Sequence, residues 1–426
     1  MAGRSNALSG VLDCAVSGPV VSCPPYSSSF GGADLFSSIR MPGGVCPSLV
    51  LDPSGAAMFA AKILGVHDEV VRERVLDVQR ANRGRLVVDD GQVVSESYKG
   101  RIMEMIEEGR MTNRVEDLGM EVRRGKVRDQ FEGKNGELVL VTTDRQSGFD
   151  RMLATIPYKG AVLNLVSAWW FEVTRDIVPN HVIEVPHPNV TVARKCKPIM
   201  IEWVMRGYIT GSTETSLWKN YQKGNYNYCG LSLPKGLKKN QKLDRPVLTP
   251  TTKSDDGDRP ISPKEIVSEG IMSQEEFDKC AKIAQQLFER GQKIAEERGL
   301  ILVDTKYELG YDEEGVIRVI DELHTPDSSR YWIKHSYQSR MADGKEPENV
   351  DKEFLRLWFA ERCDPYDTSK SLPEAPKELV AELSRKYIML YEIITGKSFD
   401  FVDGGIWGED AIKQILQKHA GAGVAV

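Results

Sequence analysis

The chain has 426 residues, and acidic residues outnumber basic ones by 62 to 56, for a formal net charge of -6. A composition of 41% hydrophobic and 28% charged residues is typical of a globular protein with two or three domains. The charge gives no sign of a nucleic-acid or membrane-surface partner, and no apolar run is long enough to span a bilayer. The seven cysteines are scattered without C-x-x-C spacing, which argues against a disulfide framework or structural zinc and favours a reducing compartment.

Residues 1–66 differ from the rest in being rich in Ser, Gly and Pro and poor in acidic groups. This composition predicts either an organelle-targeting extension or a disordered tail, and the two stay open at this point. Residues 67–113 carry two helix-like segments, EVVRERVLDVQRAN and YKGRIMEMIEEG, and form a helical extension of unknown role.

The segment Arg123–Glu132, RRGKVRDQFE, predicts a strand, a loop and a second strand. Gly125 beside Lys126 and Arg128 would let the backbone approach a phosphate that two cations face. This is not a Walker loop, because Val127 stands where Ser or Thr would bind the metal. The alternatives are a nucleotide-covering loop and a solvated basic turn.

Three further segments place polar groups in loops. Charged residues at the strand end Asp144–Arg151 lie beside Ser147, a position that commonly carries function. Arg206 and the Gly-Ser loop that follows it supply donors for a carboxylate or phosphate. The stretch 243–262 is broken by prolines and is predicted to be a long irregular loop, either functional or simply flexible.

The sequence marks the ends of three helices clearly. Capping boxes begin helices at Ser262 and Ser273, and the second helix ends at Gly299. A third helix runs from Pro376 to Gly396, and the aromatic-rich segment 163–172 predicts a buried helix that serves packing.

The segment 300–320 predicts an antiparallel hairpin with a four-residue loop. If Tyr311 pairs with Val316, then Lys306 lies opposite Asp321, and both share a face with Asp304 and Glu308. Glu308 and Asp321 could then hold one Mg²⁺ between them. A slip of one residue would replace Asp321 by Glu322, and a solvated ion-pair surface is the alternative to a metal site.

Six motifs, taken in order, closely resemble the SAICAR synthetase family over roughly residues 114–399. They are GKVRD (125–129), DRQSGFD (144–150), RGYITGS (206–212), LTPTTKSD (248–255), LVDTKYELG (302–310) and DELHTPDSSRYW (321–332). The resemblance implies a ligase of de novo purine synthesis that uses ATP and Mg²⁺ to join carboxyaminoimidazole ribonucleotide (CAIR) to L-aspartate. It also implies an α+β, two-lobed, ATP-grasp-like fold with the nucleotide in the cleft between the lobes.

The expected organisation has a β-rich nucleotide-covering lobe at 114–200, an α+β lobe with the substrate and metal site at 201–410, and a tail at 411–426. The resemblance implies roles for residues of both lobes. The catalytic residues would be Lys306, Asp304 and Arg330, and the metal ligands Glu308 and Asp321. ATP would contact Gly125, Lys126, Val127, Arg128, Lys195, Lys306 and Glu308. The substrates would contact Asp144, Arg145, Ser147, Arg206, Gly211, Ser212, Lys253, Asp255 and Arg330.

Two positions depart from the family pattern: Phe131 stands where tyrosine is usual, and Gly257 where histidine is common. The resemblance is to plant-like or algal forms, which implies a chloroplast (plastid stroma) location, with the cytoplasm as the alternative. The expected partners are the two small-molecule substrates, with no nucleic acid and no membrane, in a monomer or small homo-oligomer. The rival functions are a kinase-like phosphotransferase, whose H-R-D and D-F-G signatures are missing, and a non-catalytic nucleotide-binding module.

Overall fold

The computed structural model describes residues 21–22, 48–49, 53–112, 114–115, 121–254, 257–401 and 409–419. The chain divides into two compact units, Met1–Asn82 and Arg83–Val426. In the first unit, β1 (Val21–Ser22) pairs in parallel with β2 (Ser48–Leu49), and α3 (Pro53–Leu64) is followed by the start of α4 (Glu69–Glu96). Residues 53–64 are helical, so the alternative of a disordered tail is wrong for this part of residues 1–66.

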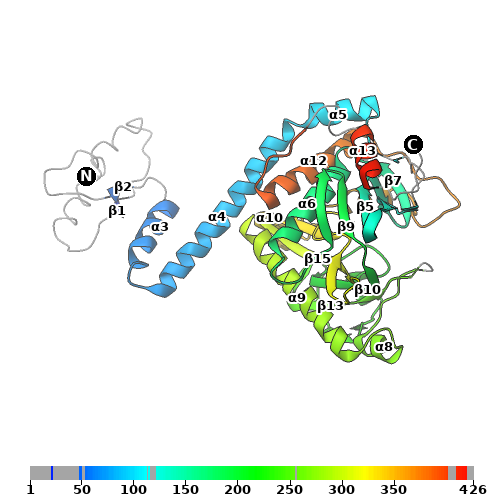
Figure 1. Ribbon diagram of the computed structural model, residues 1–426. Helices are drawn as coiled ribbons and strands as arrows, with labels where there is room; N and C mark the ends of the chain where they lie inside the picture. The colour runs from blue at the N-terminus through cyan, green and yellow to red at the C-terminus, as the bar shows by residue number, and fades with distance from the viewer. Residues whose placement is uncertain are drawn as a thin grey trace, which may run out of the picture. The chain divides into compact units, whose positions relative to one another are not determined.

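Two antiparallel sheets form the framework of the second unit (Figure 1). The five-stranded sheet has the order β3-β4-β5-β9-β8. Its strands are β3 (Val122–Arg124), β4 (Arg128–Glu132), β5 (Glu137–Thr142), β8 (Val182–His187) and β9 (Val190–Arg194). The strand, loop and strand predicted from RRGKVRDQFE are confirmed as β3 and β4, and a 3-10 turn, η3 (Lys134–Gly136), leads into β5.

The six-stranded sheet has β13, β10, β15 and β16 in that order, with β14 paired to β10 and β17 paired to β15. Its strands are β10 (Lys197–Ile209), β13 (Gln241–Leu248), β14 (Thr251–Thr252), β15 (Leu300–Tyr311), β16 (Ile317–Ile320) and β17 (Ser329–Ile333). The predicted irregular loop 243–262 is thus partly wrong, because 243–248 belongs to β13. This strand lies at the sheet edge, where Pro246 costs no ladder hydrogen bond.

The hairpin of β15 and β16 is confirmed, but its predicted register is wrong by one residue. Tyr311 pairs with Ile317, and Glu308 pairs with Ile320. The Asp312 side chain accepts hydrogen bonds from the N–H groups of Glu314 and Val316, and Gly315 has a φ of 77°. These contacts close a three-residue loop with glycine in the left-handed region, instead of the four-residue loop that was expected.

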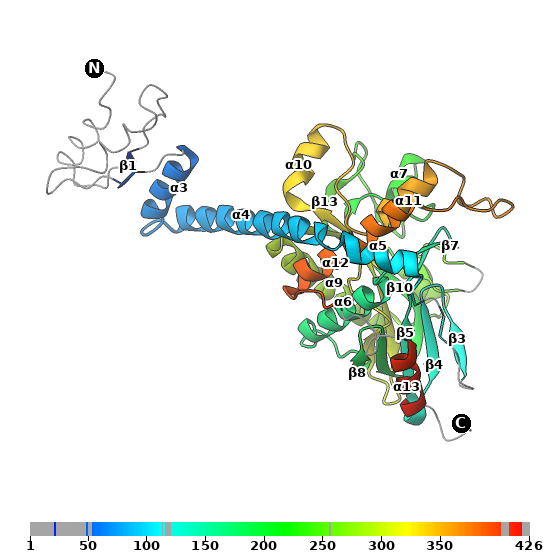
Figure 2. The ribbon, with the colours of Figure 1, turned by 90° about the horizontal axis from the view of Figure 1, so that it is seen from above.

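Nine further helices in the described part of this unit pack against the sheets and against one another. They are α5 (Lys99–Glu108), α6 (Lys159–Val173), α7 (Leu217–Gln222), α8 (Pro263–Ser268), α9 (Gln274–Glu297), α10 (Lys334–Ala342), α11 (Glu353–Ala360), α12 (Lys377–Thr395) and α13 (Glu409–His419). Helix α9 packs on β15 and β10, while α12 contacts both α5 and α6 (Figure 2). Both predicted capping boxes are present, at Ser262 and Ser273. Two short hairpins, β6 (Arg145–Gly148) with β7 (Arg151–Thr155) and β11 (Asn227–Tyr228) with β12 (Leu231–Ser232), complete the unit.

Both ends of the second unit differ from the expected domain boundaries. At the start, α5 buries Ile102 and Met105, and Tyr98 before it donates a hydrogen bond to Glu392 of α12. The helical extension therefore contributes to the packed unit from Arg83 onward. At the end, the expected tail contains α13, whose Ile412 and Leu416 pack with Phe131, Val139 and Val141 of the five-stranded sheet.

No helix in the described part of the chain is long and apolar enough to cross a membrane.

Candidate active site

The centre of the site is a charged face of the six-stranded sheet. Neighbouring strands pair Arg206 with Asp304 and Glu202 with Glu308, so their side chains lie on one face together with Lys306. The ammonium of Lys306 lies 2.6 Å from Glu202 and 3.1 Å from Glu308. Burial disfavours the charged lysine, but Glu308, Glu202 and Asp321 outweigh it and raise its pKa. Lys306 is therefore held as a cation.

Glu308 is paired with a second cation as well. The ammonium of Lys253 forms an ion pair with Glu308, and the N–H of Lys253 donates to the carbonyl of Met200 in β10. Glu308 is buried, at 7% exposure, so this carboxylate is neutralised by two lysines in a poorly solvated position. Lys253 thus lies at the charged face, while the substrate contact that the resemblance implied for it stays a prediction, and Asp255 lies outside the described residues.

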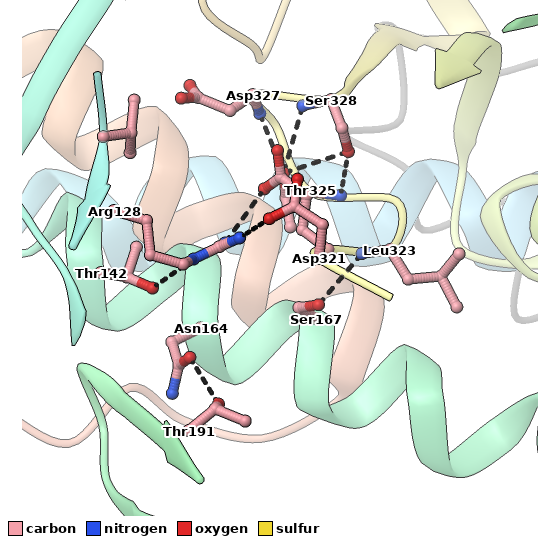
Figure 3. Close-up of polar contacts among 12 residues, drawn as sticks. Arg128, Thr142, Asn164, Ser167, Thr191, Asp321, Leu323, Thr325, Asp327 and Ser328 are labelled. Atoms are coloured by element: carbon pink, nitrogen blue, oxygen red, sulfur yellow. Dashed lines mark hydrogen bonds and ion pairs between the residues drawn. The ribbon is translucent and has the colours of Figure 1, made fainter. Parts of the chain in front are cut away.

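Arg128 joins the five-stranded sheet to this face (Figure 3). Its guanidinium is hydrogen-bonded to Asp321, lies 3.7 Å from Glu322, and donates from Nε to Thr142 Oγ1 at 3.1 Å. Asp321 directly follows β16 and has a φ of 66°, so the alternation of the strand no longer sets the direction of its side chain. Burial alone would raise the pKa of Asp321, but Arg128, Lys306 and Lys253 lower it, which favours the carboxylate.

The glycine-bearing turn 125–128 is held by Arg145. The Gly125 N–H donates to the Arg128 carbonyl at 2.9 Å, and a Cβ at Gly125 would come within 2.6 Å of that oxygen. Arg145 donates to the carbonyls of Gly125 and Lys126 and pairs with buried Asp129 at 2.7 Å. The side chain of Lys126 is exposed and forms an ion pair with Asp150 at 2.5 Å.

Three other residues expected to contact nucleotide or substrate have different surroundings. Val127 accepts two hydrogen bonds through its carbonyl, from the N–H and hydroxyl of Thr143. Lys195 is half exposed and paired with Glu132 at 2.8 Å, and none of its described contacts reaches another candidate residue. Ser147 is half buried in the β6–β7 hairpin.

Asp144 is an internal anchor in this structure. Its two carboxylate oxygens accept the N–H groups of Thr112 and Gly160, at 2.9 and 2.8 Å. It is 2% exposed, and burial raises its pKa to about 6, against the effect of the two backbone donors. Asp144 therefore fixes the N-terminal end of α6 beside the site, and both of its oxygens are engaged by the backbone.

A second group of charged side chains surrounds Arg330. Asp304 lies 2.5 Å from Arg330 and 3.6 Å from Arg206, while Arg206 donates from Nε to Thr249 at 2.8 Å. Glu353 of α11 accepts the Ser212 hydroxyl at 2.5 Å and lies 3.4 Å from Arg330. Gly211, with a φ of 110°, leaves no room for a Cβ against Ser216. The RGYITGS loop and Arg330 thus converge, as the resemblance implied.

Three acidic residues at the site were not predicted from the sequence: Glu202, Glu353 and Asp129. Glu322, which was expected only if the hairpin slipped by one residue, lies 3.7 Å from Arg128. The alternation of β10, which places Glu202 and Arg206 on one face, was a signal that could have identified Glu202. The other two depend on tertiary contacts with Arg330 and Arg145, which no local pattern contains.

Two family models match the chain. The SAICAR synthetase model matches residues 121–373, which contain the whole charged face and Arg330. The AIR carboxylase model matches residues 1–84, about a fifth of the chain.

Relatives of known name agree with the first match. The phosphoribosylaminoimidazole-succinocarboxamide synthase of Legionella pneumophila (strain Paris) is 61% identical over 298 residues, 70% of this chain and 95% of the relative. The Arabidopsis thaliana protein of that name, termed chloroplastic, is 53% identical over 332 residues, 76% of this chain and 80% of the relative. The solved SAICAR synthase of Saccharomyces cerevisiae, complexed with SAICAR, is 32% identical, with a TM-score of 0.59 over 68% of this chain and 99% of that one. The chain belongs to the SAICAR synthetase family.

Proposed function

We propose that this chain is an ATP-dependent carbon–nitrogen ligase that joins CAIR to L-aspartate and releases SAICAR, ADP and phosphate in purine biosynthesis. The observation that carries the proposal is the meeting of Arg128, Lys253 and Lys306 with the carboxylates of Glu308 and Asp321, inside the region matched by the family. Three cations around two carboxylates suit a site where phosphate charge moves.

The chemistry divides into two steps. The γ-phosphoryl group of ATP passes to a carboxylate oxygen of CAIR, which gives an acyl phosphate and ADP. The aspartate nitrogen then attacks the acyl carbon, loses a proton, and expels phosphate. Lys306 and Lys253 stabilise the negative charge that spreads over the transferred group, because their ammonium groups are already fixed by Glu202 and Glu308.

Glu308 and Asp321 would hold Mg²⁺. The two carboxylates lie near the same lysines, since Lys306 and Lys253 act on Asp321 and both pair with Glu308. Magnesium is usually held by one or two protein carboxylates together with substrate phosphates, so this pair fits the ion. Within the described residues no group of three or more His, Cys, Asp or Glu is arranged to hold a metal. When bound, Mg²⁺ neutralises charge on the ATP phosphates.

For the substrates, we assign anion recognition to Arg206, Ser212 and Arg330, with Gly211 supplying the close approach of backbone. Asp304 positions both arginines, because it lies between them. Lys126, Arg128 and the turn around Val127 would contact ATP phosphates. Lys195 would reach the nucleotide only after separating from Glu132.

The two-lobed, ATP-grasp-like arrangement is part of the proposal. The five-stranded sheet would cover the nucleotide, and the six-stranded sheet would carry the metal and substrate groups. Arg128 of β4 supports this division, because it faces Asp321 at the end of β16.

The assay that tests the function follows ADP release by purified protein with ATP, CAIR and aspartate, together with reactions that omit one substrate at a time. A SAICAR synthetase requires all three. ADP release that needs neither CAIR nor aspartate would support a phosphotransferase or ATPase, and nucleotide binding without turnover would support a regulatory module.

The N-terminal segment has two candidate roles. The plant relatives named chloroplastic favour a plastid location for this protein, with residues 1–66 as the targeting segment. The AIR carboxylase match favours a different origin for residues 1–84, as part of a carboxylase unit whose name describes formation of the carboxylated imidazole that the ligase consumes. Fusion of residues 1–84 to a reporter decides between them, because a targeting segment carries the reporter into plastids and a carboxylase fragment leaves it in the cytosol.

A further inference from the structure

Four buried polar residues form a chain of contacts behind the site, which we call the buried bridge: Gln146, Tyr387, Asp327 and Lys159. The Tyr387 hydroxyl lies 3.2 Å from Gln146 Oε1 and 2.9 Å from Asp327 Oδ1. The ammonium of Lys159 lies 2.9 Å from Asp327 Oδ2. Gln146, Lys159 and Tyr387 are fully buried, and Asp327 is 8% exposed. The proposed chemistry uses none of these groups.

The bridge joins two segments that carry candidate substrate contacts. Gln146 lies in β6 between Arg145 and Ser147. Asp327 lies in the loop that follows Asp321 and leads into β17, which carries Arg330 (Figure 3). Lys159 is the first residue of α6, and Tyr387 comes from α12. Two core helices thus hold the 144–148 segment and the 321–330 loop in a fixed relation.

The loop itself depends on such anchors. Asp321 and His324 both have positive φ, a conformation that non-glycine residues adopt only when the surroundings enforce it. The Leu323 N–H donates to Ser167 of α6, and the Tyr307 hydroxyl lies 2.6 Å from His324 Nε2. Asp327 adds the only ion pair that ties this loop to α6 among the described contacts.

Burial of an ion pair is costly, so this one is weak evidence for stability alone. Burial would raise the pKa of Asp327, but Lys159 and Lys352 lower it, so the group is held as an anion. Burial and the Asp327 anion raise the pKa of Tyr387, which keeps its hydroxyl proton as a donor. A carboxylate with both oxygens engaged has a single orientation, which suits a positioning role.

We propose that Lys159 and Tyr387 are positioning residues for the ligase reaction, which act through Asp327 and Gln146 to align the 321–330 loop with the 144–148 segment around the substrates. The inference rests on the proposed function. It assigns neither residue a contact with substrate.

The test compares Tyr387→Phe and Lys159→Met with matched controls in the full chain. Tyr387→Phe keeps the ring and removes the hydroxyl that touches both segments. Its control is Tyr391→Phe, one turn further along α12, where the ring packs against Phe399. The control for Lys159→Met is Lys386→Met, whose ammonium donates to the Asn349 carbonyl outside the bridge.

We expect Tyr387→Phe to lower kcat/KM for CAIR and aspartate by about 10- to 100-fold, because small misplacements of reacting groups carry costs of that size. The KM for ATP should change less than the KM values for CAIR and aspartate. Lys126 and the turn around Val127 lie outside the bridge, whereas the 321–330 loop touches the nucleotide side of the site through Asp321, the partner of Arg128. Lys159→Met should act in the same direction, and both controls should retain wild-type kinetics. Wild-type kinetics with every substrate in Tyr387→Phe overturn the proposal. So does a loss of stability in which the kinetic parameters for CAIR, aspartate and ATP change equally.

The assay of wild-type protein tests the proposed function separately from the positioning role. If wild-type protein shows no ADP release that depends on CAIR and aspartate, the ligase assignment fails whatever the variants do. If wild-type protein is active and Tyr387→Phe matches it, the ligase assignment stands and the positioning role fails. Should Lys159→Met fail to fold, the Tyr387→Phe comparison still decides the matter.

Discussion

The guanidinium of Arg128 is hydrogen-bonded to the carboxylate of Asp321, 193 residues further along the chain. Arg128 comes from the five-stranded sheet and Asp321 from the end of a strand in the six-stranded sheet. Because both side chains are largely buried, with 11% and 28% exposure, the pair is only partly screened by solvent. One contact therefore links the turn proposed to cover ATP with the carboxylate proposed to hold magnesium.

Asp321→Asn should lower kcat by on the order of 100-fold or more, because it removes a charge where phosphoryl transfer concentrates it. The amide keeps the size of the side chain. The melting temperature should fall slightly, since the lowered pKa of Asp321 shows that the folded protein favours the anion. The measurement is kcat against metal concentration, where Mn²⁺ should restore more activity than Mg²⁺.

Glu322→Gln is the matched comparison for Asp321. Glu322 accepts the Thr325 hydroxyl at 2.7 Å and lies farther from Arg128 than Asp321 does. We expect a smaller loss of kcat and no rescue by Mn²⁺. If Glu322→Gln is crippled and rescued by metal while Asp321→Asn is nearly normal, Glu322 is the ligand; if neither change matters, the charged face is not the metal site.

Arg206→Lys should raise the KM for CAIR or aspartate more than the KM for ATP, because a planar fork of donors becomes a point charge. The net charge is unchanged, and Asp304 keeps a cationic neighbour. Steady-state kinetics with each substrate varied in turn provide the measurement. Arg318→Lys, which alters an arginine paired with Asp312 away from the site, serves as the control. A rise in the KM for ATP alone would show that Arg206 contacts the nucleotide instead.

The helices and strands of this fold could be predicted from the sequence where local signals are strong. Capping boxes at Ser262 and Ser273, the alternation of 300–309 and the glycine after α12 each fix an element through contacts within a few residues. The hairpin register could not be predicted, because it depends on the hydrogen bonds that the Asp312 side chain accepts within the loop. One extra paired residue shifts every partner along β16.

The candidate site shows the same limit. Lys306, Glu308 and Arg330 lie among the charged groups of the site, which their contiguous motifs made predictable, while the roles expected for them stay predictions. Asp321 reaches Arg128 through a positive φ that ends the strand pattern, so it joins the charged face although the predicted register is wrong by one residue, and its role as a metal ligand stays a prediction. Glu353 could not be named, since it meets Ser212 only through packing of α11.

Deletion of residues 1–66 should leave kcat/KM and the melting temperature unchanged, because the larger unit begins at Arg83. Deletion of residues 1–108 should lower the melting temperature by several degrees. That variant loses α5, which buries Ile102 and Met105 against the rest of the unit, and the hydrogen bond from Tyr98 to Glu392. Thermal unfolding and the ligase assay check both. Lost activity in the shorter deletion would give the N-terminal segment a part in catalysis.

Asp144 offers a test of whether a candidate residue contacts substrate or anchors the fold. Its pKa of about 6 lies above the ordinary value of 3.8, because burial disfavours the anion. The folded protein therefore binds this proton more tightly than the unfolded chain does. The contribution to stability is fully present below pH 3.8 and is lost as pH rises through about 6.

Asp144→Asn removes this titration and weakens one of the two backbone hydrogen bonds, to Thr112 or Gly160. The variant should be less stable than wild type near pH 4, and the gap in melting temperature should narrow between pH 4 and pH 7, as the wild-type carboxyl loses its proton in a buried site. Melting curves at half-unit pH steps provide the measurement, with Asp150→Asn as the exposed control. A gap that stays constant with pH, together with a raised KM for CAIR or aspartate, would instead make Asp144 a substrate contact.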